Sequence, residues 1–260
     1  MYRIGLKLWS VNTDAYLREA GRLYADGVFS YIELFVVPDT LDTLDAWHRL
    51  HEERSVPFVI HNAHAAAGFN LADRSAEVRN REICAQTRKF ADALDARYVI
   101  FHGGVDGSIE ETSRQLKALE EPRALLENTP VKPLPNKAGV TSCRGATIDD
   151  IGHVLAATGC GFCLDVGHAI CAANAQGLEP YSYIAELSRR FKPAMFHLSD
   201  VVDMSSPYDA HPHLGTGALD IARLKRELFP GDAMISIETV KDSPTDLGDF
   251  VQDTRRLRNE

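Results

Sequence analysis

Histidine, aspartate and glutamate residues follow a series of short apolar runs in this 260-residue sequence. The clearest case is the stretch CLDVGHA, residues 163–169, in which Asp165 closes an apolar run and His168 comes three positions later. Burying a carboxylate at the end of an apolar strand is costly unless something pairs with it. The question that this stretch raises is therefore which group pairs with Asp165, and whether His168 shares that partner.

The same residue types end five other apolar runs. They are His61 and His64 in HNAHAAAGFNLAD, His102 in FHGG, Glu127 in LLENTP, His197 in FHLSD with Asp209, His211 and His213 in the following DAHPHLGTG, and Glu238 in SIETV. Several carboxylates brought together at low dielectric would repel one another strongly, and few cationic residues lie in these motifs. Divalent metals are the simplest neutralising agents, and mixed imidazole and carboxylate ligands suit zinc, manganese or iron. We therefore expect more than one bound metal.

The elements that must position these side chains are buried strands that alternate with helices. The apolar runs are short, continuous and often β-branched or aromatic, which is typical of strands buried on both faces. They cover residues 4–8, 31–35, 58–60, 98–101, 124–126, 162–164, 194–198 and 234–237. Eight strand-plus-helix units in about 250 residues predict a single (β/α)₈ barrel, an α/β fold, over residues 1–260. A doubly wound sheet is the second possibility, but it would need a glycine-rich turn after the first strand, which GLKLWSVNTD lacks.

The loops that follow the strands indicate where the functional site lies. In a barrel of this kind the carboxyl ends of the strands share one face, where active sites lie. The long loops at residues 128–146 and 199–217 follow the fifth and seventh strands, and loops of such length are usually functional. Thr147 and the pair Ser243-Pro244 are expected to begin helices.

Composition indicates an ordinary globular protein. The formal net charge is −9, which does not favour a non-specific nucleic-acid binder, although bound metals can reverse the local sign. Five cysteines, including the pair Cys160 and Cys163 of a CxxC, are expected to be reduced. The sequence has neither a membrane-spanning apolar run nor a secretory signal, so we expect a cytoplasmic protein.

In their order along the chain and in their local sequence, these motifs resemble the endonuclease IV family of abasic-site DNA repair enzymes, part of the wider xylose isomerase-like TIM-barrel group. The resemblance runs from about residue 58 to residue 240. It includes the Asn70-Leu71 pair after His64, the ENT of Glu127, the Asp-x-x-His of Asp165 and His168, and the Leu214-Gly-Thr-Gly217 turn after His211. Each of the family's nine metal ligands has a counterpart in this chain.

The resemblance implies a three-metal site, with zinc expected and manganese or iron as alternatives. Its first metal would be held by His64, His102 and Glu127, its second by Glu127, Asp165, His197 and Glu238, and its third by His168, Asp209 and His211. Glu127 and Glu238 are the implied catalytic carboxylates, and Glu127 would orient the attacking water. The implied activity is that of a metal-dependent phosphodiesterase, with an abasic-site endonuclease as its narrow form.

The sequence departs from the family where DNA would be gripped. The repair enzymes insert bulky side chains after the first histidine ligand, whereas this chain has AAAG at residues 65–68. The main alternative is therefore a sugar or sugar-phosphate isomerase or epimerase, which would use one metal and in which Glu33 could act. An iron-dependent oxidase or peptide-modifying enzyme is a more distant alternative. His213 is out of register, His61 is expected to face the barrel wall, and His48, His51 and His153 are expected on solvated helix faces.

Overall fold

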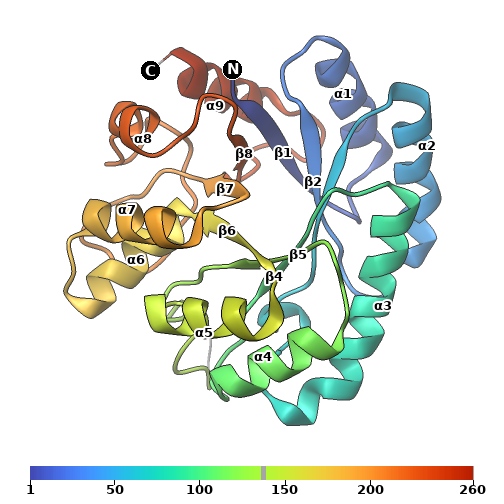
Figure 1. The fold of residues 1–260 in the computed structure, drawn as a ribbon. Helices are drawn as coiled ribbons and strands as arrows, with labels where there is room; N and C mark the ends of the chain where they lie inside the picture. Colours follow the sequence, from blue (N-terminus) through green and yellow to red (C-terminus); the bar gives the residue numbers. More distant parts are fainter. Residues whose placement is uncertain (136–138, 260) are drawn as a thin grey trace.

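Eight parallel strands close into a barrel in the computed structural model, in which each strand pairs with the next and β8 pairs with β1 (Figure 1). The structure describes residues 1–135 and 139–259. The strands are β1 (Arg3–Trp9), β2 (Tyr31–Phe35), β3 (Phe58–His61), β4 (Val99–His102), β5 (Ala124–Glu127), β6 (Gly161–Asp165), β7 (Met195–Leu198) and β8 (Met234–Ile237). Each lies within one or two residues of its predicted run. The predicted (β/α)₈ barrel is confirmed, and a doubly wound sheet is excluded because such a sheet is open at both edges.

Helices surround the strands (Figure 1). They are α1 (Asp14–Ala25), α2 (Leu44–Arg54), α3 (Glu77–Ala93), α4 (Ile109–Ala118), α5 (Ile148–Thr158), α6 (Val166–Gln176), α7 (Pro180–Phe191), α8 (Ile221–Glu227) and α9 (Gly248–Asn259). Thr147 caps α5 as predicted, since its hydroxyl accepts a hydrogen bond from the Asp150 amide. The helix start expected at Ser243 is wrong, because the Ser243 hydroxyl caps only a turn at Thr245 and Asp246, and α9 begins later.

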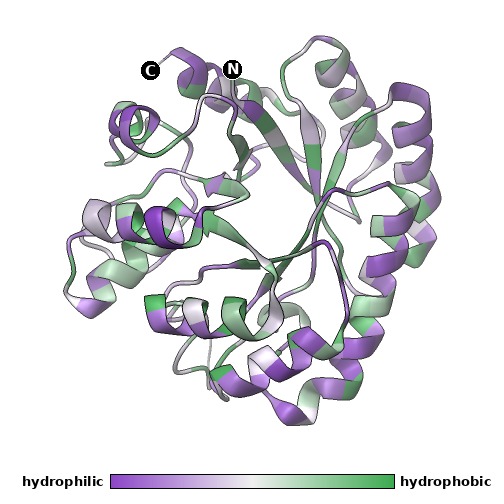
Figure 2. Cartoon of the chain, viewed as in Figure 1, coloured by the Kyte–Doolittle hydropathy of each residue, from purple (hydrophilic) through white to green (hydrophobic). Residues whose placement is uncertain are grey.

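The outer core lies between the helices and the barrel wall. Hydrophobic residues are concentrated in the strands, and many hydrophilic residues lie along the surrounding helices (Figure 2). Large side chains such as Trp47, Phe90 and Phe250 are fully buried in this layer. Within the described residues the cysteines are unpaired, and no helix is both long and apolar enough to cross a bilayer.

A second, smaller core fills the barrel interior. It consists of one buried side chain from each of seven strands, namely Tyr31, Val59, Ile100, Leu125, Cys163, Met195 and Met234. The core residue on each of these strands therefore shows which alternate positions face the interior. Because successive side chains of a strand point to opposite faces, the residue two positions later must also face the interior, nearer the carboxyl end.

Candidate metal centre

The alternation of side chains along each strand brings the polar side chains together above the small interior core. Two positions after each core residue, or four in β8, the inward residues are Glu33, His61, His102, Glu127, Asp165, His197 and Glu238. The buried interior core lies beneath them. The barrel thus presents a ring of imidazoles and carboxylates at its carboxyl-terminal face.

Glu127 lies at the centre of four imidazoles. Its Oε2 atom is 3.0 Å from Nε2 of His61 and 3.0 Å from Nε2 of His102. Its Oε1 atom is 3.2 Å from Nδ1 of both His168 and His197. Burial alone would raise the pKa of this carboxyl, but His102 and His197 hold the pKa of Glu127 well below its usual value. Glu127 is therefore a buried anion that contacts both sides of the site.

Glu127 also belongs to a group with Asp165, His197 and Glu238, in which one ligand atom from each residue lies within 4.8 Å of the others. The 3.2 Å contact between Oε1 of Glu127 and Nδ1 of His197 is not a hydrogen bond, and among the described residues both atoms, like Oδ2 of Asp165, are buried without a hydrogen-bond partner. Leaving one buried polar atom unpaired costs about 1–3 kcal/mol, so three converging atoms indicate a ligand. Two carboxylate oxygens and an imidazole nitrogen fit a divalent cation.

Asp165 divides its two oxygens between structure and site. Oδ1 accepts a hydrogen bond of 2.6 Å from the backbone amide of His168 and so caps α6. Oδ2 is the atom without a partner. Burial raises the pKa of Asp165 to about 6, with the charge of Glu127 acting in the same direction. Protein groups thus offset only part of the free-energy cost of burying the Asp165 carboxylate.

His168, Asp209 and His211 form a separate group, again with ligand atoms within 4.8 Å of one another. Oδ2 of Asp209 lies 3.4 Å from Nε2 of His168 and 2.5 Å from Nε2 of His211. Burial would lower the pKa of both histidines, but Asp165 raises that of His168 well above its usual value and Asp209 raises that of His211. His168 therefore connects this group to Glu127 on its other side.

The backbone at His211 is held in an unfavourable conformation. Its φ angle is 50°, in the left-handed region that non-glycine residues rarely adopt. The Val240 amide donates to the His211 carbonyl at 3.2 Å, and the Asp200 amide donates to the Pro212 carbonyl at 3.1 Å. Such strain persists only where surrounding structure imposes it and is concentrated at functional sites.

His61 does not lie as the sequence indicated, whereas the expected ligand role of His64 stays a prediction. The expectation that His61 faces the wall is wrong, because His61, His102 and Glu127 form a compact group of possible ligands. His64 follows the strand and lies outside the groups of the described residues, with its ring stacked on that of His102 at a centroid distance of 5.3 Å. Burial lowers the pKa of His64 to about 3, with the nearby His102 and His61 acting in the same direction, so its ring is neutral.

Sequence reasoning missed a cation at this site. Lys7 is 5% exposed, and its Nζ atom lies 2.5 Å from Oε1 of Glu33 and 2.5 Å from Oε1 of Glu238. The expectation that the ligand motifs hold few cations took no account of the first strand. The alternation of side chains along the strand could have found Lys7. Gly5 faces the interior, where the Tyr31 ring packs against it, and Lys7 comes two positions later and so faces the same way.

The remaining histidines lie away from these groups. Nδ1 of His213 is 2.8 Å from Oδ2 of the buried Asp253, and its Nε2 is 3.2 Å from Asp242. His48 and His153 are exposed on α2 and α5, whereas His51 is half-buried.

A cavity of about 390 Å³ opens above the ligand groups, a size that suits a small molecule or one extruded group of a larger one. Its wall combines the site histidines with apolar side chains, which include Trp9, Phe35, Val105, Pro130, Pro133, Leu134 and Val140. Several of these belong to the loop at residues 128–146, of which residues 136–138 lie outside the described part.

Hydrogen bonds attach this loop to the segment after β4. Oδ1 of Asp106 accepts from the Thr141 amide at 2.9 Å and from the Ser142 amide at 3.1 Å. At Gly103 an added Cβ would lie 2.3 Å from the Arg144 carbonyl oxygen, so only glycine lets the loop pack there. The described residues 141–144 of the loop are therefore held against the segment after β4, beside His102.

Comparison with known proteins places this barrel in a family. The family model described as xylose isomerase-like TIM barrel matches residues 17–260. The chain belongs to the xylose isomerase-like TIM-barrel family. Curated relatives include the probable endonuclease 4 of Mycobacterium ulcerans (strain Agy99), 34% identical, and that of Mycobacterium leprae (strain TN), 31% identical. Each alignment covers 193 residues, 70% of this chain and 74% of the relative.

Solved structures share the fold over almost the whole chain. Endonuclease IV from Thermus thermophilus has a TM-score of 0.71 at 24% identity, covering 98% of this chain and 97% of that one. A D-tagatose 3-epimerase-like protein has a TM-score of 0.73 at 17% identity, covering 98% and 96%. The family resemblance inferred from the motifs is thus confirmed, and the buried ligand groups indicate metal binding.

Proposed function

We propose that the protein is a divalent-metal-dependent phosphodiesterase of the endonuclease IV type. The observation that carries the proposal is the arrangement of three ligand groups around shared residues. Glu127 belongs to two of the groups, and His168 contacts Glu127 from the third. A one-metal enzyme would need only one such group, whereas phosphoester hydrolysis benefits from several adjacent cations.

The proposed ligand sets are supported by this arrangement and by the family resemblance. Glu127, Asp165, His197 and Glu238 would hold one ion, and His168, Asp209 and His211 another. His102 and Glu127 would hold a third, together with His64 as the resemblance implies or with His61 as the geometry favours. When bound, these ions activate water and offset the negative charge of a phosphoester.

The chain's own residues would orient the reactants. Glu127 is ionised and central, with one oxygen facing His61 and His102 and the other facing His197, so it would bridge the two sides of the site and orient a water between them. Glu238 lies at the open side of its group and lines the cavity, where it can contact a substrate. The wall of Trp9, Phe35 and the loop would exclude bulk water around the reacting phosphate.

The substrate could be abasic DNA or a smaller phosphoester. The turn Ala65–Ala67 beside His64 carries no bulky side chain that could unstack bases. The cavity wall is largely apolar, with Lys132 on the loop as a cation near the mouth. These features favour a small phosphoester over a duplex.

A sugar isomerase or epimerase is the second candidate, because the small cavity and the buried Glu33 also suit a sugar. Metal content and two substrates separate the two functions. Protein loaded with Zn²⁺ or Mn²⁺ should bind more than one ion per chain and hydrolyse bis(p-nitrophenyl) phosphate. An abasic-site duplex in the same assay tests the narrow form. One bound ion with no phosphodiester cleavage, but with epimerisation of a ketose, would support the second candidate instead.

A further inference from the structure

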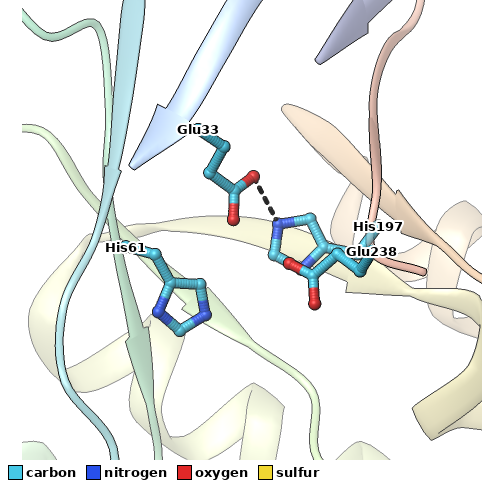
Figure 3. Close-up of side chains that lie close together, drawn as sticks. All are labelled: Glu33, His61, His197 and Glu238. Carbon is cyan, nitrogen blue, oxygen red and sulfur yellow. Dashed lines mark hydrogen bonds and ion pairs between the residues drawn. The ribbon is translucent and has the colours of Figure 1, made fainter. Parts of the chain in front are cut away.

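A fourth group of possible ligands lies beside the proposed metal centre. It consists of Glu33, His61, His197 and Glu238, whose ligand atoms lie within 4.8 Å of one another (Figure 3). His197 and Glu238 are shared with the Glu127 group, whereas Glu33 comes from β2 and has no place in the ligand sets above. By residue type alone this group would be a further divalent-metal site.

A protein cation already lies in this group. The ammonium of Lys7 is 2.5 Å from one oxygen of Glu33 and 2.5 Å from one oxygen of Glu238, and it joins strands β1, β2 and β8. Lys7 can contact both Glu33 and Glu238 because the barrel is closed and β1 pairs with both β2 and β8. A divalent ion between Glu33 and Glu238 would have to approach that ammonium at close range, where like charges repel strongly.

The other oxygen of Glu33 is also fully engaged. It accepts hydrogen bonds from Nε2 of His197 at 2.9 Å and from the hydroxyl of Ser236. The Ser236 hydroxyl in turn lies 3.0 Å from the hydroxyl of Tyr31. Protein groups thus satisfy both oxygens of Glu33, in contrast to the unpartnered Oδ2 of Asp165.

We propose that the Lys7 ammonium is the resident cation of the Glu33–His61–His197–Glu238 group, so that it excludes a divalent ion from Glu33 and sets the upper limit on the metal content of the barrel. Lys7 and Glu33 are then positioning residues. Lys7 holds one oxygen of Glu238. Glu33 accepts from Nε2 of His197 and so turns Nδ1 of that ring toward Glu127, as an acidic partner commonly orients a ligating histidine.

The test counts metal ions in variants that differ only in this group. Wild type, Lys7→Met and the double variant Lys7→Met/Glu33→Gln are stripped with a chelator, reloaded with Mn²⁺ and analysed for metal per folded chain. Methionine keeps the length of lysine and removes its charge. We expect Lys7→Met to bind one more ion than wild type, and the double variant to return to the wild-type number. An unchanged number in Lys7→Met, or an extra ion that survives Glu33→Gln, would overturn the proposal.

A second measurement needs no variant and decides the matter if Lys7→Met does not fold. Anomalous scattering from wild-type crystals grown with Mn²⁺ locates each bound ion. We expect no ion in contact with the Glu33 carboxylate, and an ion there would refute the role of Lys7. Neither readout depends on phosphoester hydrolysis, so its absence would weaken the proposed function without affecting this inference.

Discussion

Asp165 should destabilise the metal-free protein, and replacing it by asparagine should therefore stabilise that form. Its pKa rises from 3.8 to about 6 because the side chain is buried beside other carboxylates. A carboxyl whose pKa is higher in the folded state favours folding while it is protonated, and that contribution is lost as the pH rises through the folded-state value. At pH 7.5 the ionised Asp165 thus opposes folding, by up to about 3 kcal/mol for a shift of roughly two units.

The Asp165→Asn substitution separates this cost from the structural role of the side chain. Asparagine retains an oxygen that can accept the 2.6 Å hydrogen bond from the His168 amide, so the cap of α6 is kept. It replaces the unpartnered Oδ2 by an uncharged amide. In a chelator at pH 7.5 we expect the melting temperature to rise by roughly 5–10 °C at most. The gain should shrink below about pH 5, where wild-type Asp165 is protonated.

The matched control is Asp209→Asn, because Asp209 is also a proposed ligand but its pKa shifts the other way. Burial would raise the pKa of Asp209, but hydrogen bonds with His168 and His211 lower it below its usual value. An acid with a lowered pKa stabilises the fold above its unfolded-state value. Asp209→Asn should therefore lower the melting temperature in chelator at pH 7.5.

Thermal unfolding of wild type and both variants, with chelator and with Mn²⁺, completes the experiment. Metal should stabilise wild type and much less so either variant, since each variant lacks a proposed ligand. An Asp165→Asn protein that is folded but no more stable than wild type in chelator would refute the reasoning. A rise in stability for Asp209→Asn would also refute the reasoning, because the two carboxylates would then have effects of the same sign on the stability of the fold.

Three further predictions concern the same centre. Glu127→Ala should abolish the proposed phosphodiesterase activity and remove more than one ion by elemental analysis; unchanged metal content would contradict its proposed central role. His213→Ala should leave the metal content unchanged but lower the free energy of unfolding by about 1–3 kcal/mol, measured in urea, because it removes a partner of buried Asp253. Despite burial, Asp165 raises the pKa of His168, and Cys163 and Glu238 raise that of His197 in the metal-free protein, so metal uptake near pH 7 should release protons and strengthen with rising pH. Calorimetry in buffers of different ionisation enthalpy measures this release, and uptake without it would contradict the assignment.

The sequence alone determined the barrel and the order of its polar residues. Eight apolar runs at regular spacing required burial on both faces, and a closed barrel with helices outside satisfies that requirement. Asp165, His197 and Glu238 could be placed near one another because each ends a parallel strand, and all such ends meet at one face. These inferences rest on local hydrophobicity and on chain direction, which are properties of the sequence.

Only the tertiary structure decided which atoms meet. His61 lies on β3 with inward parity and reaches Glu127, whereas His64 lies beyond the strand, and motif register favoured the second. Lys7 contacts Glu238 across 231 positions because closure of the barrel pairs β1 with β8. Alternation along the first strand can indicate that Lys7 faces the interior, but its contact with Glu238 depends on strand register and side-chain direction in three dimensions.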